Sequence, residues 1–163
     1  MHIQRIGPQA HDMEIGYRYE EGALVADGTP APARDPMAGV YTPSTRPGSR
    51  LPHAVLEREG RRVSTHDLVR PDGFTLFCSR AVWRRAAASA ARKAGIAIDV
   101  VQVGGRGART PAWRDGTGTW ARLREFGPGG AILVRPDAHV AWRAIDMPAD
   151  PAAALAEIFE AIL

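Results

Sequence analysis

The pattern of hydrophobic and polar positions divides the chain into two parts. Residues 1–50 are rich in proline and glycine and show no sustained helical or strand period. Only residues 14–25 have strand-like content there, with Tyr17 and Tyr19 at alternating positions. Such a segment buries too few apolar side chains to order itself alone. We therefore predict an extended arm at residues 1–50, lying across another surface, followed by a folded domain at residues 51–163.

The first half of the domain predicts strands on either side of one helix. Two alternating runs flank Glu59 and Gly60, a pair typical of a tight β-turn. A helical face with tryptophan and alanine at every third or fourth position follows, and Gly95 stands where helices end. The expected elements are a β-hairpin at 53–69, a strand at 73–79, a helix at 81–95 and a strand at 96–103.

The second half of the domain begins with a glycine-rich loop and continues with a short helix at 119–126. Residues 131–144 form two alternating runs around Pro136 and Asp137, a pair that favours a type I turn. Asp150 then caps a last helix whose first residue is Pro151. The apolar stripe of that helix consists of Leu155, Ile158, Phe159 and Ile162.

This order of elements predicts the fold class. A β-α-β unit followed by an antiparallel hairpin and a final helix is the thioredoxin-like arrangement. The run at 96–103 is almost continuously apolar, as in a strand that is buried on both faces. We therefore expect an α/β fold, a thioredoxin-like mixed sheet covered by helices on both faces, with an extended N-terminal arm.

Composition and charge exclude several classes of partner. The 163 residues are 45% hydrophobic and 24% charged, which is ordinary for a soluble globular domain. The net charge is +3, but basic residues are interleaved with acidic ones and form no stripe with aromatic residues. No apolar run is long enough to span a membrane, and the first residues lack the pattern of a signal peptide. We expect no nucleic-acid or membrane partner and a cytoplasmic location.

Three phrases carry a resemblance to a known family, in the right order and spacing. Residues 130–144 read GAILVRPDAHVAWRA, residues 46–69 read RPGSRLPHAVLEREGRRVSTHDLV, and residues 14–25 read EIGYRYEEGALV. Together they resemble the C-terminal thioredoxin-like domain of FAD-dependent aromatic-ring monooxygenases of the phenol and chlorophenol hydroxylase type. One departure is Ala138, which stands where that family commonly has glycine after Pro-Asp.

The resemblance implies a parent enzyme that uses NAD(P)H, FAD and molecular oxygen to hydroxylate an aromatic ring. The flavin-binding turn of such enzymes, GxGxxG between a strand and a helix, has no counterpart here. Gly105-Arg106-Gly107 and Gly116-Thr117-Gly118 each lack the third glycine, so we interpret them as loop glycines. We expect no catalytic or cofactor-binding residue in this chain. The expected role is a structural or oligomerisation domain whose partner is a flavin-binding domain or subunit, or a second copy.

The alternative is a stand-alone, degenerate thioredoxin-like protein with a redox or small-ligand binding role. Cys78 is the only cysteine, and it ends the first central strand near the place where thioredoxins carry a CxxC pair. Without a second thiol to resolve a mixed disulfide, a structural buried thiol is the favoured interpretation. The five histidines are not spaced as metal ligands, so no metal site is expected.

Contacts with a partner are expected from the arm and from the phrases that carry the resemblance. Trp113, in a glycine-rich loop beside Arg109 and Arg114, is the first choice for an exposed contact residue. Without a flavin domain, the apolar side chains of the arm need either the sheet edge of their own domain or a second copy. We predict a dimer or weaker self-association, with residues 14–45 in the contact. The candidate interface residues are Tyr17, Tyr19, Arg50, His53, Trp113 and His139.

Overall fold

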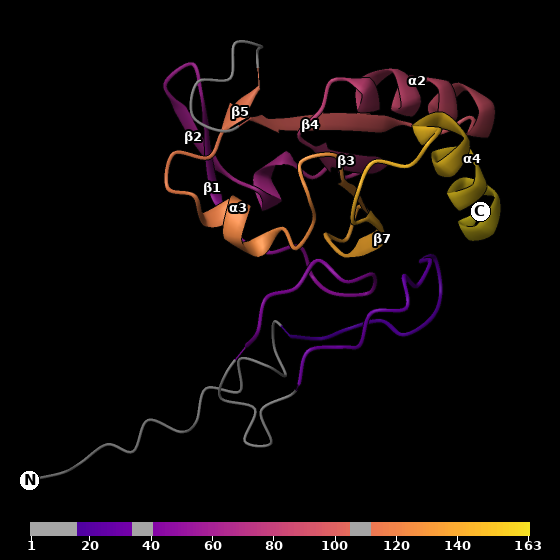
Figure 1. Ribbon diagram of the computed structural model, residues 1–163, viewed down its shortest axis with the longest axis horizontal. Coiled ribbons are helices and arrows are strands. Elements are labelled where there is room, and N and C mark those ends of the chain that lie inside the picture. The colour runs from indigo at the N-terminus through magenta and orange to yellow at the C-terminus, as the bar shows by residue number, and fades with distance from the viewer. Residues whose placement is uncertain (1–15, 34–40, 105–111) are drawn as a thin grey trace, which may run out of the picture.

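The computed structural model describes residues 16–33, 41–104 and 112–163, and these contain one seven-stranded mixed sheet. Its strand order is β2-β1-β5-β4-β3-β6-β7 (Figure 1). The strands are β1 (Val55–Arg58), β2 (Arg61–Ser64), β3 (Phe74–Cys78), β4 (Ile98–Gly104), β5 (Trp113–Arg114), β6 (Ala131–Val134) and β7 (Val140–Ala144). The helices are η1 (His66–Leu68), α2 (Val82–Ala94), α3 (Thr119–Leu123) and α4 (Pro151–Ile162).

The centre of the sheet has the expected thioredoxin-like topology. Strands β3 and β4 are parallel and are joined by α2, as a β-α-β unit requires. Strand β6 is antiparallel to β3, and β7 is antiparallel to β6. Helix α4 follows β7. The predicted α/β class and the thioredoxin-like mixed sheet are therefore confirmed.

Both faces of the sheet are covered, because side chains of successive strand residues point to opposite sides. On β3, Leu76 and Cys78 pack in a core cluster with α2 and α4, which lie next to each other in Figure 1. Phe77 belongs to a second cluster, where its ring lies 5.5 Å from the ring of Trp120 on α3. The expected burial of β4 on both faces is wrong for its first half, where Asp99 is exposed and lies 3.0 Å from Arg70.

Residues at the ends of the strands and helices adopt the turn and cap conformations that the sequence predicts. Glu59 and Gly60 have φ of 53° and 78°, as the turn between β1 and β2 requires. The Asp150 carboxylate accepts the backbone amides of Ala152 and Ala153 at 2.9 and 3.0 Å and so caps α4.

The hairpin is shorter than predicted. Strand β2 ends at Ser64, and the chain then turns into η1 instead of continuing as a strand to Val69. The backbone amide of Ser64 donates to the Asp67 carboxylate at 2.9 Å, which stabilises that turn. Leu68 and Val69 still pack against the core cluster around Phe77, but from a turn rather than from a strand.

The turn between β6 and β7 places a non-glycine residue in the left-handed region. Ala138 has φ of 61°, and its amide donates to the carbonyl of Arg135 at 3.0 Å. An L-residue with a Cβ is strained there by about 1 kcal/mol. The turn still forms because the two strands that flank it, β6 and β7, are largely buried in the sheet.

We predict that Ala138→Gly raises the free energy of unfolding by up to about 1 kcal/mol, because glycine adopts the left-handed conformation without strain. Urea denaturation followed by circular dichroism measures the change. The matched control is Ala88→Gly at an exposed position of α2, which should lower the free energy of unfolding by about 1 kcal/mol. A loss of stability in Ala138→Gly as large as in the control contradicts the assignment of strain.

The described part of the arm lies along the edge of its own domain, against β7 (Figure 1). Gly48 donates its amide to the carbonyl of Val140 at 2.8 Å, and Val140 donates to the carbonyl of Ser49 at 2.9 Å. The amide of Val25 donates to the carbonyl of Ala141 at 2.8 Å. The arm therefore satisfies backbone groups of β7 that would otherwise form an open sheet edge.

Glycine is required at one point of the arm. Gly48 has φ of 89°, and a Cβ there would lie 1.9 Å from the carbonyl oxygen of Tyr19. That close approach lets the amide of Tyr19 donate to the carbonyl of Gly48 at 3.0 Å. Residues 16–25 form no strand, so the strand-like content expected there is not realised in this described part.

Within the described ranges, no helix has the length and apolarity that crossing a bilayer demands.

Candidate functional site

Cys78 lies at the carboxyl end of β3, where a thioredoxin would carry its reactive pair. Its side chain is buried, and the sulfur donates to the carbonyl of Arg80 at 3.6 Å. Burial raises the pKa of the Cys78 thiol to about 12, although the nearby charge of Arg84 acts in the opposite direction. Since the thiolate is the nucleophile, a thiol that stays protonated at neutral pH is unreactive. These features support the structural interpretation of Cys78.

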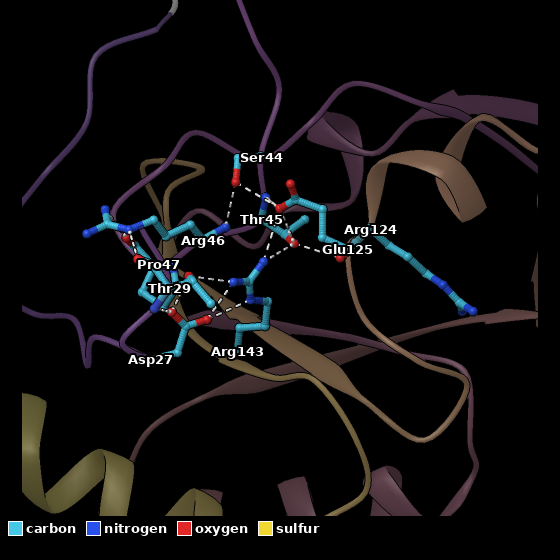
Figure 2. Close-up of polar contacts among 9 residues, drawn as sticks. All are labelled: Asp27, Thr29, Ser44, Thr45, Arg46, Pro47, Arg124, Glu125 and Arg143. Carbon is cyan, nitrogen blue, oxygen red and sulfur yellow. Dashed lines mark hydrogen bonds and ion pairs between the residues drawn. The ribbon is translucent and has the colours of Figure 1, made fainter. Parts of the chain in front are cut away.

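Arg143 of β7 is a buried cation with partners in three parts of the chain, around residues 27–29, at Thr45 and at Glu125, as Figure 2 shows. Its Nε donates to Asp27 Oδ2 at 2.8 Å, and its Nη2 lies 2.6 Å from the same oxygen. Nη1 donates to Glu125 Oε2 at 3.0 Å and to the Thr45 hydroxyl at 3.2 Å. Nη2 also donates to the Thr29 hydroxyl at 2.8 Å. Every guanidinium nitrogen is therefore bonded.

Glu125 accepts further hydrogen bonds from the arm in this network. Its Oε2 also accepts the Ser44 hydroxyl at 2.8 Å and the Thr45 amide at 2.7 Å. Glu125 has φ of 52°, an uncommon conformation for a residue with a side chain. The Thr45 hydroxyl donates to the carbonyl of Arg124 at 2.6 Å. We call Asp27, Thr29, Ser44, Thr45, Glu125 and Arg143 the arm cluster.

The arm cluster holds two carboxylates around one guanidinium, so its ionisation matters. Burial alone would raise the pKa of Asp27, but hydrogen bonds from the Thr29 hydroxyl and amide, together with Arg143, outweigh burial. The pKa of Asp27 is therefore lowered from 3.8, and the carboxylate is charged at neutral pH. The cluster links arm segments around residues 27–29 and 44–45 to β7 and to the end of α3. These ion pairs and hydrogen bonds stabilise the arm on the domain and do not form a reactive centre.

A second group of arm contacts surrounds Tyr19 and contains three of the six candidate interface residues. The Arg135 guanidinium lies over the Tyr19 ring at 4.6 Å, and the rings of His139 and Tyr17 lie at 4.8 and 5.0 Å. His139 is buried, whereas Tyr17 is 57% exposed. Arg50, the fourth candidate, forms a β-bridge with His139. The structure thus brings these four residues into one region, which we call the tyrosine patch.

The other two candidates lie elsewhere. His53 is exposed at the β1–β2 hairpin, with its Nδ1 at 2.8 Å from the Ser64 hydroxyl. The prediction for Trp113 is wrong, because this side chain is only 6% exposed. Trp113 is the first residue of β5, which lies between β1 and β4, and its ring packs in the core with the guanidinium of Arg58 at 4.7 Å.

The glycine content around Trp113 concealed this two-residue strand, which only its neighbours in the sheet define. Arg109 and the glycines Gly105 and Gly107 lie outside the described residues. In the part of the chain that the structure describes, no three His, Cys, Asp or Glu side chains gather so that they could bind a metal ion.

Comparison with known proteins identifies the family. Residues 44–163 match the family model of the aromatic-ring hydroxylase C-terminal region. The chain belongs to this family. The match begins at Ser44, one residue before Thr45, so the second arm segment of the arm cluster belongs to the matched region.

Curated members of this aromatic-ring hydroxylase family are similar over nearly the whole chain. The 2,4-dichlorophenol 6-monooxygenase of Cupriavidus pinatubonensis (strain JMP 134 / LMG 1197) is 40% identical over 94% of this chain and 26% of its own length. The phenol 2-monooxygenase of Pseudomonas sp. (strain EST1001) is 40% identical over 91% of this chain and 24% of its own length. The chain therefore spans about a quarter of these relatives.

Solved structures of aromatic-ring hydroxylases agree with this placement. The flavin-dependent monooxygenase PieE, solved in complex with FAD and substrate, matches 94% of this chain with a TM-score of 0.84 and 46% identity. Aklavinone-11 hydroxylase, solved with FAD and aklavinone, matches 90% with a TM-score of 0.74 and 36% identity. The chain covers 26% of each of those two proteins. It thus corresponds to the C-terminal quarter of FAD-containing monooxygenases.

Sequence reasoning missed the arm cluster. Arg143 stands inside an otherwise apolar strand, and an arginine in such a place is the one available signal of a buried ion pair. Nothing near Asp27 or Glu125 identifies either of them as its partner, because both lie in irregular segments.

Proposed function

We propose that this chain is the C-terminal structural and oligomerisation domain of an FAD-dependent, phenol-type aromatic-ring monooxygenase, and that it catalyses no reaction alone. The observation that carries the proposal is the match of nearly the whole chain to only a quarter of its FAD-containing relatives. FAD, NAD(P)H, oxygen and the aromatic substrate would then be handled by the remaining part of the enzyme. The partner of this domain is that flavin-binding part, in the same or a separate polypeptide.

The tyrosine patch is the surface that we assign to this partner. Tyr17 stands in the first described stretch of the arm, and the residue is 57% exposed. Tyrosine at a protein surface offers a rigid aromatic face with a polar end, which favours protein interfaces. The ring contacts with Tyr19 hold it in place. Self-association of the domain stays a further prediction, with the same patch and His53 as candidates.

Two measurements test this function. The purified full chain should elute from gel filtration without flavin absorbance and should not oxidise NAD(P)H in the presence of phenols. It should bind the flavin-containing portion of the related 2,4-dichlorophenol 6-monooxygenase from which the last quarter has been removed. Tyr17→Ala should weaken that binding about tenfold, and Glu21→Ala, at an exposed position of the same arm, should leave it unchanged within about twofold. Stoichiometric flavin retained by the chain alone overturns the proposal.

The second candidate, a stand-alone thioredoxin-like redox protein, depends on Cys78. The burial of this thiol and its raised pKa argue against it. Insulin reduction by the wild-type chain that disappears in Cys78→Ala would favour this alternative.

A further inference from the structure

A cavity of about 660 Å³ opens at the carboxyl ends of the parallel strands β3 and β4. From β3 the chain continues into α2 on one face of the sheet, and from β4 it leads towards α3 on the other. In open α/β sheets, a crevice at such a divergence of connections is the preferred place for a ligand. Residues from both connections line this one, including Ser79, Gly104, Gly116 and Trp120.

The polar walls of the cavity are fixed by hydrogen bonds. Gln102 is only 7% exposed, and its Oε1 accepts Arg84 Nε at 3.1 Å while its amide donates to the Ser79 carbonyl at 3.4 Å. Arg124 Nη1 donates to the Ser79 hydroxyl at 2.8 Å, and its guanidinium lies 5.4 Å from the ring of Phe126. Polar groups held in this way lose little freedom when a ligand binds.

The charge of the lining selects the class of ligand. Arg80 and Arg124 both line the cavity, and neither forms an ion pair with a carboxylate of the described residues. The lining also holds one carboxylate, Asp115, whose Oδ2 accepts the amide of Ala121 at 2.9 Å near the start of α3 and whose Oδ1 is buried without a hydrogen-bond partner among the described residues. Two arginines against one carboxylate leave the lining with a positive balance, and arginine suits a phosphate or carboxylate group because it binds either through paired hydrogen bonds.

We propose that this cavity binds a small oxyanion, a carboxylate or phosphate compound, through Arg80 and Arg124. Trp120, Val103 and Pro128 supply apolar wall for the body of such a ligand. The site uses no residue of the tyrosine patch or of the arm cluster. Its success or failure is therefore independent of the function proposed above.

Titration of the full chain with inorganic phosphate and, separately, with benzoate tests the site. Amide NMR shifts at constant ionic strength should saturate below about 10 mM and concentrate at Ser79, Gln102 and Gly116. Saturation by phosphate alone or by benzoate alone supports the site and shows whether it prefers a phosphate or a carboxylate group.

Arg80→Gln and Arg124→Gln should each raise the dissociation constant about tenfold. Arg85→Gln removes the same charge from an exposed position of α2 outside the cavity and should change it by less than about twofold. Arg80 is exposed, so its variant keeps the test valid even if Arg124→Gln lowers stability. Three results overturn the proposal. They are equal dissociation constants for Arg80→Gln and wild type, changes in amide NMR shifts near all the arginines and not at the cavity, and no saturation with either anion.

Discussion

Replacing Arg143 with methionine should lower the free energy of unfolding by about 3 kcal/mol or more. The substitution keeps much of the apolar stem but leaves the carboxylates of Asp27 and Glu125 without a cation. The Asp27 side chain is only 11% exposed, so water replaces little of the lost interaction. The Glu125 side chain is 39% exposed and contributes less, because solvent screens it.

Urea denaturation followed by circular dichroism measures this effect. Arg143→Lys should lie between methionine and wild type, because an ammonium keeps the charge but cannot reach both carboxylates with a planar fork. Arg62→Met on β2 is the matched control, since Arg62 is exposed, and it should change the free energy of unfolding by less than about 0.5 kcal/mol. If Arg143→Met and Arg62→Met cost the same, the arm cluster does not stabilise the fold.

Acid provides an independent check on the same cluster. The pKa of Asp27 is lower in the folded chain than its ordinary value of 3.8. The stabilisation from Asp27 is therefore complete above 3.8 and is lost as the pH falls through the lower, folded pKa. Wild type should lose this part of its stability in acid, whereas Asp27→Asn should be less stable at neutral pH and lack that part of the pH dependence.

A chain that begins at Arg46 should be destabilised by about 3 kcal/mol or more and should self-associate. It keeps the pairing of Gly48 and Ser49 with β7 but loses Asp27, Thr29, Ser44 and Thr45 from the arm cluster. Arg143 then retains only Glu125, and the hydrogen bond from Val25 to β7 disappears. Part of β7 becomes an open sheet edge, which is a template for pairing with another copy.

Denaturation and light scattering on the two chains decide between two arrangements of the arm. A chain that begins at Gly16 is the control, because it retains every described contact of the arm. If the arm lies on its own domain, light scattering should give a lower molecular mass for the chain that begins at Gly16. The chain that begins at Arg46 should then give a higher mass, because it self-associates. A dimeric control and a monomeric shorter chain would instead indicate that the arm joins two copies, as the sequence predicted, and would contradict exposure of the edge.

The sequence by itself determined the elements whose signals are local. Asp150 and Pro151 mark the start of α4 because a cap and its helix are neighbours along the chain. Likewise, Gly95 ends α2 through its own left-handed conformation. The order of strands and helices was then sufficient for the thioredoxin-like topology, since a β-α-β unit and a tight hairpin leave few ways to build a sheet. The family followed from three phrases in the correct order.

Only the tertiary structure decided where the irregular segments lie. Trp113 is buried because β1 and β4 flank it, and no residue beside it in the sequence carries that information. The pair of Asp27 and Arg143 joins residues 116 positions apart, and either charge taken alone is typical of a solvated surface. A buried charge becomes favourable only when its partner and the hydrogen bonds around both are in place. Those bonds exist only once the arm lies on β7, so the arm cluster is a property of the folded chain.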